Sequence, residues 1–171
     1  MHMSDQREIA APVAEVWAAL LSADSLLHCV PGAKEVTGNA DDGFEATVVQ
    51  KVGPVKATFK GQVALSNLVE GESLTLTGEG KGGAAGFAKG GADVTLAASE
   101  TGTLLSYEVD AKVGGKLAQL GSRLIDGFAK KMADQFFTNL QTSLEGPAEE
   151  AADADADEAP KKSLLKRMTG G

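Results

Sequence analysis

The chain has 171 residues, of which 43 % are hydrophobic and 23 % charged, enough for one domain with its own core. Its net charge is −8, and residues 1–144 carry 12 bases against 17 acids, which disfavours binding to a nucleic-acid backbone. No run approaches the ~20 apolar residues of a membrane span, the start shows no signal pattern, and the single Cys29 excludes an internal disulfide and suits a reducing cytoplasm.

The first third of the chain predicts a short strand and two helices. Residues 4–10 read as a strand, and Pro12 is suited to the first position of a helix because its missing N–H would be unpaired there. Apolar side chains then follow at i, i+3, i+4, i+7 and i+8, the spacing of an amphipathic helix: Val13, Val16, Trp17, Leu20 and Leu21. Asp24 is expected to cap a second short helix that ends at Pro31-Gly32.

The middle of the chain alternates with a period of two, which predicts antiparallel strands with one covered face. Gly53-Pro54 is a turn between strands at 44–52 and 55–65, and further strands are expected at 74–81, 92–98 and 103–113. The face expected to be covered carries many small residues: Ala57, Gly61, Gly78, Gly80, Ala92, Ala98 and Ala111.

A long helix is predicted for residues 115–144, after Gly114-Gly115. Its polar side chains fall within a narrow arc, and its wide apolar side needs the apolar face of the sheet as a cover. The order of one strand, two helices, about six strands and a long helix is that of an α+β helix-grip fold, a curved antiparallel sheet around a C-terminal helix.

Small residues on two facing surfaces predict an apolar cavity of a few hundred Å³ between the sheet and the long helix. Gly121 and Gly127, read here as interior helix glycines, support a packing or binding reason, since each costs about 1 kcal/mol relative to alanine. The alternative is that the strand glycines only ease the curvature of the sheet. We expect the cavity to be lined by Trp17, Phe59, Gly61, Leu76, Gly78, Phe87, Tyr107, Leu117, Leu120, Gly121, Leu124 and Phe128.

The sequence offers little for catalysis or metal binding. His28 and Cys29 are adjacent, so on a helix they point in different directions, and no three or four His and Cys residues are available as metal ligands. Gly78–Gly83 formally matches G-x-G-x-x-G but runs into a glycine-rich stretch and not a helix, which favours a hairpin loop. That loop is a candidate flap at the mouth of the cavity, with Phe87 at its tip.

Three segments resemble the CoxG family of carbon monoxide dehydrogenase subunits. They are KVGPVKATFKG at 51–61, GEGKGGAAGFAKG at 78–90 and VGGKLAQLGSRLID at 113–126, and AKKMADQFF at 129–137 fits as well. The resemblance covers about residues 4–143. It implies membership of the START-like and polyketide-cyclase-like (SRPBCC) superfamily, in agreement with the helix-grip order.

The resemblance also implies a role. It suggests an accessory protein, not an enzyme, that recruits an aerobic molybdenum-containing carbon monoxide dehydrogenase, or a related molybdenum hydroxylase, to the membrane. It further implies carriage of an isoprenoid quinone, such as menaquinone or ubiquinone, to accept electrons, with no covalent cofactor and no metal. We expect a cytoplasmic protein that associates peripherally and reversibly with the inner membrane.

The last 27 residues form two predicted segments beyond the folded domain at 1–144. Residues 145–160 hold seven acids and no base, a composition typical of a disordered linker. Residues 161–171 form a basic amphipathic tip whose side chains could contact an anionic membrane: Lys161, Lys162, Leu164, Leu165, Lys166, Arg167 and Met168. A merely solvated tail, or a tip that docks on an acidic patch of a partner protein, are the alternatives.

Two other functions stay open. A cyclase or dehydratase of the helix-grip type would need titratable groups facing the cavity, whereas Glu79, Glu108 and Asp110 fall on the outward face by parity. A maturation chaperone for the molybdenum enzyme would need no ligand at all.

Overall fold

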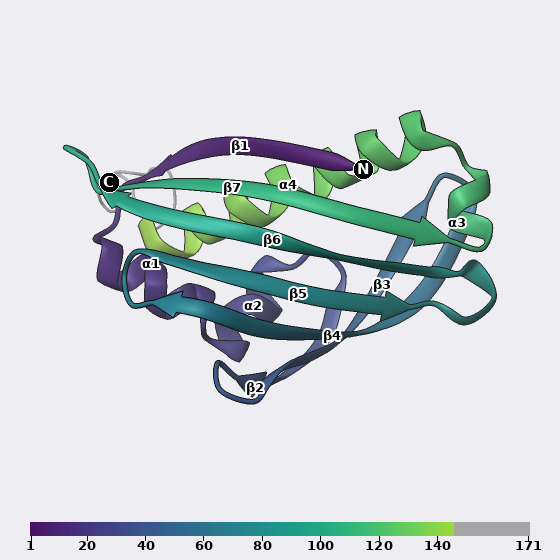
Figure 1. Cartoon of the computed structure of the whole chain (residues 1–171), viewed down its shortest axis with the longest axis horizontal. Helices are drawn as coiled ribbons and strands as arrows, with labels where there is room; N and C mark the ends of the chain where they lie inside the picture. Colours follow the sequence, from purple (N-terminus) through teal and green to yellow (C-terminus); the bar gives the residue numbers. More distant parts are fainter. Residues whose placement is uncertain (146–171) are drawn as a thin grey trace, which may run out of the picture. The chain divides into compact units, whose positions relative to one another are not determined.

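A computed structural model describes residues 1–145 and contains one antiparallel sheet of seven strands in the order β1-β7-β6-β5-β4-β3-β2 (Figure 1). The strands are β1 (His2–Ile9), β2 (Ala33–Asn39), β3 (Gly43–Val52), β4 (Val55–Val69), β5 (Ser73–Lys81), β6 (Phe87–Ala98) and β7 (Thr103–Gly114). The helices are α1 (Val13–Leu20), α2 (Ala23–Cys29), the 3-10 turn η1 (Gly83–Ala85), α3 (Lys116–Gln119) and α4 (Ser122–Glu145). This is the predicted helix-grip order.

The chain divides into two compact units, Met1–Asn139 and Leu140–Gly171. The described part of the second unit, residues 140–145, continues the helical backbone of α4. The predicted linker at 145–160 lies outside the described residues apart from Glu145, and so does the predicted tip at 161–171. Both segments, and the boundary at residue 144, stay predictions.

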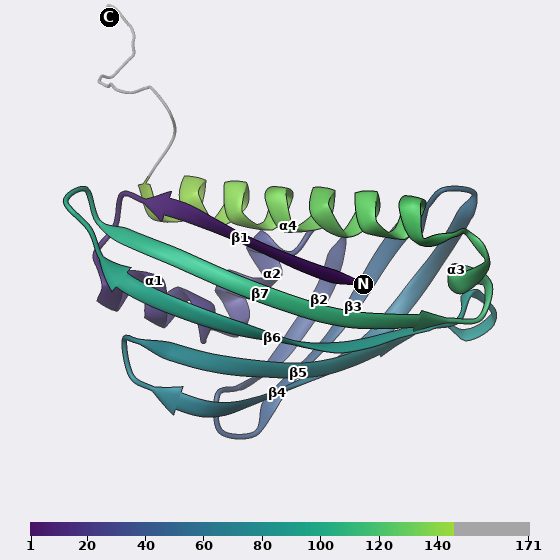
Figure 2. The same cartoon turned by 45° about the horizontal axis from the view of Figure 1, so that its top comes forward.

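Within the first unit the sheet curves around α4 up to Asn139, while α1 and α2 lie near one end of the strands (Figure 2). Alternation sets the two faces. Phe44 pairs with Val63 on the inner face, and the neighbouring pair Glu45 and Gln62 is exposed on the outer face. The concave face is therefore apolar and the convex face polar, as the period of two predicted.

The two short helices begin where their sequences predict, with one change of cap. The side chain of Ser22 accepts a hydrogen bond from the backbone N–H of Ser25 at 3.3 Å, so Ser22 caps α2. The expected cap, Asp24, lies in the first turn, where its carboxylate favours the positive end of the helix dipole.

Three elements differ from the sequence prediction. β2, at the sheet edge beside β3, was not assigned to specific residues. β6 begins at Phe87, so most of the expected glycine-rich loop is strand, and only residues 82–86 turn between β5 and β6. The long helix is broken: α3 ends at Gln119, and Gly121, with φ of +91°, separates it from α4.

Candidate functional site: apolar cavities between the sheet and the helices

A cavity of about 850 Å³ lies between the inner face of the sheet and the α3–α4 segment. We call it the main cavity. Its sheet side is formed by β1, β3, β4, β5, β6 and β7, and its helix side by residues from Leu117 to Met132. The volume is at the upper end of the ~300–1,000 Å³ typical of sites for small organic ligands.

The main cavity exists because small residues face each other across it. Gly80, Ala88 and Ala111 lie on the sheet side, and Ala118 and Ala129 on the helix side. Larger apolar side chains close its ends: Val52, Leu117 and Ile125 form a buried cluster, against which Phe59 and Phe128 pack. The protein leaves this volume unfilled, because no side chain large enough to span the gap points into its middle.

A second apolar cavity, of about 330 Å³, adjoins the first across Met3 and Val109, which line both. We call it the inner cavity. It lies toward α1 and α2, and Leu20, Leu26 and Phe136 are among its lining residues. Its walls are apolar apart from the tyrosine hydroxyl of Tyr107.

The structure brings six of the expected lining residues to these cavities. Phe59, Leu117, Gly121 and Phe128 line the main cavity, whereas Leu76 and Tyr107 line the inner cavity. Gly61 and Gly78 line neither; each borders a shallow hollow among polar residues of the sheet. Ligand contact at any of these residues stays a prediction.

The other four expected residues lie elsewhere, which corrects the sequence prediction. Phe87 is on the outer face of β6, because the small residues Ala88, Gly90 and Ala92 take the inward positions, and it is no loop tip. Leu124 is 40 % exposed and lies over the β3–β4 turn, within reach of Gly53. Trp17 is half-buried on α1, outside both cavities, and Leu120 packs against the buried cluster.

Several lining residues were not predicted, although a signal existed for some of them. Val109, Ala111 and Val113 share the inward parity of β7, so counting in steps of two finds them. Met3 and Gln50 had no such signal, because β1 is mostly polar and Gln50 is a polar residue on an inward position.

The polar groups of the main cavity are gathered at its rim. Its exposed lining residues are Lys112 at the end of β7 and four from α3–α4, namely Ala118, Gly121, Ser122 and Asp126. Half-buried Gln50 donates a hydrogen bond from its side-chain amide to the carbonyl oxygen of Pro31. The main cavity thus has an apolar interior and a polar mouth beside the α3–α4 break.

A polar contact joins β1 to α4 beside the inner cavity. The guanidinium of Arg7 lies 3.3 Å from the Asp134 carboxylate, 3.5 Å from the Thr138 hydroxyl and 5.7 Å from the centre of the Phe137 ring. That ring stacks on Tyr107 at 4.9 Å. Burial, with smaller effects from the charges of Asp5 and Asp134, raises the pKa of the Tyr107 phenol, so this hydroxyl is a neutral donor at pH 7.

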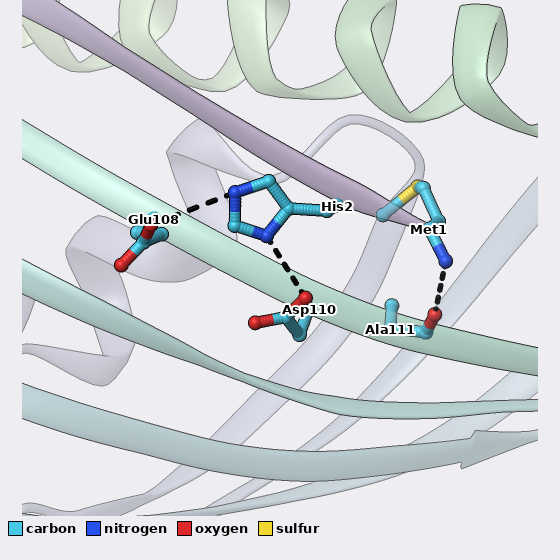
Figure 3. A network of polar contacts seen from close by, with 5 residues as sticks. All are labelled: Met1, His2, Glu108, Asp110 and Ala111. Atoms are coloured by element: carbon cyan, nitrogen blue, oxygen red, sulfur yellow. Dashed lines mark hydrogen bonds and ion pairs between the residues drawn. The ribbon is translucent and has the colours of Figure 1, made fainter.

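The ionisable groups of the described chain form no evident catalytic set. Burial raises the pKa of the Cys29 thiol, which makes it a poor nucleophile. Glu79, Glu108 and Asp110 are exposed, and His2 bridges the last two on the sheet surface (Figure 3). Within residues 1–145, no three His, Cys, Asp or Glu side chains come together as a metal site would require.

None of the helices in the described part of the chain has the length and apolar character needed to span a membrane.

The model of the CoxG family of carbon monoxide dehydrogenase subunits matches residues 6–145. The chain belongs to this family. The match spans all of the α1–β7 region and both helices of the cavity wall, so the CoxG assignment covers the whole of the site described above. A comparison with curated proteins finds no match.

Solved structures show the same fold. A conserved protein from Geobacillus kaustophilus is 26 % identical, with a TM-score of 0.79 over 85 % of this chain and 95 % of that one. A START superfamily protein from Mycobacterium smegmatis is 14 % identical, with a TM-score of 0.64 over 84 % of this chain and 97 % of that one. A protein from Chromobacterium violaceum is 19 % identical, with a TM-score of 0.62 over 84 % and 97 %. The CoxG chain therefore has a START-like fold.

Proposed function

We propose that this CoxG protein is a non-enzymatic accessory protein of a molybdenum-containing carbon monoxide dehydrogenase, or a related molybdenum hydroxylase, and that it carries a quinone-like lipid. The observation that carries the proposal is the main cavity, about 850 Å³ in volume and apolar except at its mouth. The name of the family supports the enzyme partner. The membrane tip at 161–171 stays part of the proposal, outside the described residues.

The distribution of polar groups fits an amphipathic ligand. An isoprenoid chain would occupy the interior between Phe59, Phe128 and Met132, where burial of apolar area is favourable. The carbonyl oxygens of a quinone accept hydrogen bonds, and the Ser122 hydroxyl and the Lys112 ammonium at the rim are donors. The head group would then lie at the mouth and the chain inside.

The absence of a catalytic set among the described residues favours carriage over a cyclase or dehydratase reaction. Tyr107 is the ionisable residue that lines the inner cavity, and its raised pKa keeps the phenol protonated, so it is suited to donate a hydrogen bond and not to act as a base. The maturation chaperone would show the same family match, but it gives the protein no reason to maintain an apolar cavity.

Two substitutions one helical turn apart test where the ligand binds. Ala129 lines the main cavity and Ala133 the inner cavity, so phenylalanine at either position fills one cavity and leaves the other. We expect the purified protein to bind menaquinone or ubiquinone extracted from vesicles, detected by mass spectrometry. Ala129→Phe should lower the bound fraction at least tenfold, and Ala133→Phe should lower it less.

Two outcomes contradict the proposal. One is that no quinone or other apolar molecule is bound by wild-type protein after exposure to lipid. The other is that Ala129→Phe, folded by circular dichroism, binds as much as wild type. If the protein instead copurifies only with an inactive molybdenum enzyme and is dispensable after assembly, the chaperone reading replaces the carrier.

A further inference from the structure

Six lysines project from the outer face of the sheet, opposite the cavities. They form three cross-strand pairs in register: Lys51 with Lys56, Lys60 with Lys81, and Lys89 with Lys112. Residues directly opposite in an antiparallel ladder have Cβ atoms about 4.5–5.5 Å apart, and like charges there are destabilising. We call these six residues the lysine face.

The lysines are exposed and uncompensated. Glu79 lies among them, opposite Lys89, but no ion pair joins any of the six lysines to another residue in the described part of the chain. Three repulsive pairs on one face of an otherwise acidic protein add nothing to the fold. A binding role explains their presence.

Charge is segregated along the molecule's first unit. Lys116 of α3 and Arg123 of α4 lie at the same end of the sheet as the lysine face, next to the β5–β6 turn, so this end holds eight of the 12 bases in residues 1–144 (Figure 1). The far half of the outer face carries acids instead, with Asp93 opposite Glu108. An anionic surface would therefore orient the protein with its α3 end inward.

The same end bears exposed apolar side chains and the mouth of the main cavity. Phe87, 37 % exposed, pairs with Lys81 and covers Gly114. Leu124, 40 % exposed, lies between the β3–β4 turn and the rim residues Ser122 and Asp126. Apolar side chains surrounded by lysines, next to an apolar cavity, fit the interface of a bilayer.

We propose that the α3 end of the folded domain, comprising the lysine face, Phe87 and Leu124, docks on an anionic lipid bilayer with the mouth of the main cavity toward the membrane. The choice of lipid over protein rests on residue type: protein interfaces are depleted in lysine and enriched in arginine, and this surface offers seven lysines and one arginine. The inference rests on the proposed carrier function for its purpose, and it is separate from the predicted tip at 161–171.

Vesicle binding of the full chain tests the proposal. The probe is a set of vesicles of phosphatidylglycerol and phosphatidylcholine, compared with vesicles of phosphatidylcholine alone. Lys60→Gln/Lys81→Gln removes two facing charges, and about 1 kcal/mol per base near an anionic surface predicts roughly 10- to 30-fold weaker binding. Lys130→Gln/Lys131→Gln, two exposed lysines on α4, is the control with the same change in net charge.

A label reports the orientation. With Cys29 buried, Leu124→Cys can be modified selectively with a polarity-sensitive fluorophore, and Ala97→Cys, exposed at the acidic half, is the matched control. We expect a blue shift on anionic vesicles for the label at 124 and none at 97.

Three results would overturn the inference. The lysine-face variant could bind vesicles as tightly as the α4 control, the label at 124 could stay in water, or the variant could lose only its binding to an acidic protein. Repeating the assay with Gln at Lys161 and Lys162 separates the tip from the domain. Because Ala129→Phe should still bind vesicles, failure of the docking surface and failure of quinone carriage remain distinguishable.

Discussion

Gly121 and Gly127 lie six residues apart and have opposite backbone requirements. Gly121 has φ of +91°, in the region that L-residues rarely adopt, and it ends α3 at the rim of the main cavity. Gly127 lies inside α4 with helical backbone geometry. A Cβ atom at either position would meet no atom within 4 Å, so backbone conformation alone separates the two sites.

Alanine at these two positions should therefore change stability in opposite directions. Gly121→Ala should lower the free energy of unfolding by about 1–2 kcal/mol, because it forces a strained φ. Gly127→Ala should raise it by up to ~1 kcal/mol, because alanine has the higher helix propensity. Urea unfolding of both variants measures the difference. A loss of stability in Gly127→Ala would show that this glycine is kept for close approach of another molecule.

At the scale of elements, β1 holds the sheet edge through its ladder with β7 and through His2 (Figure 3). The His2 Nδ1 atom lies 2.9 Å from the Asp110 carboxylate, and Nε2 lies 3.5 Å from that of Glu108. The amino-terminal nitrogen of Met1 donates to the Ala111 carbonyl oxygen at 2.9 Å. The hydrogen bond with Asp110, followed by the charge of that carboxylate, raises the pKa of the His2 imidazole above its usual value of about 6.5.

The raised pKa fixes the direction of the pH dependence. His2 favours folding fully below its unfolded pKa, and this contribution is lost as the pH rises through the higher folded value. An NMR titration of the His2 ring should give a midpoint above 6.5. Asp110→Asn should lower that midpoint more than Glu108→Gln, because Asp110 makes the shorter contact and is the larger cause; equal effects would mean that the bond at 2.9 Å is absent in solution.

The elements also show how far sequence patterns reach. Alternation and the Gly53-Pro54 turn predicted β3 and β4 within a few residues, because each strand has one apolar and one polar face. β2 was missed because this edge strand has a single large apolar residue, Val36, and so no alternating pattern. The α3–α4 break was missed because the apolar spacing continues through Gly121, and only the positive φ interrupts the helix.

The cavity itself was predictable, but its walls were only partly so. Small residues on facing elements indicate unfilled volume, and the parity of β6 places Ala88 inward and Phe87 outward when counted back from Ala92. The rim was not predictable, since Lys112, Ser122 and Asp126 meet only through the geometry of the helix break. Nor does one-dimensional spacing show that lysines on five different strands gather on one face.

At the scale of the whole molecule, an unfilled cavity couples ligand binding to stability. A ligand that binds the folded chain alone stabilises it by RT ln(1 + [L]/Kd), or about 2.7 kcal/mol at 100 times Kd. For a chain of this size each kcal/mol raises the unfolding midpoint by about 2–4 °C, so a saturating quinone should raise it by roughly 5–11 °C. Without ligand, Ala129→Phe should melt near the wild type, because the added ring occupies vacant volume and needs little rearrangement of its neighbours.

A thermal shift assay with a short-chain menaquinone in detergent checks this coupling, with detergent alone as the blank. Wild type and Lys60→Gln/Lys81→Gln should show the full rise, because the lysine face is opposite the cavities and does not line them except at Lys112. Ala129→Phe should show little. An equal rise in Ala129→Phe would place the stabilising ligand outside the main cavity, and the carrier role would lose its structural basis.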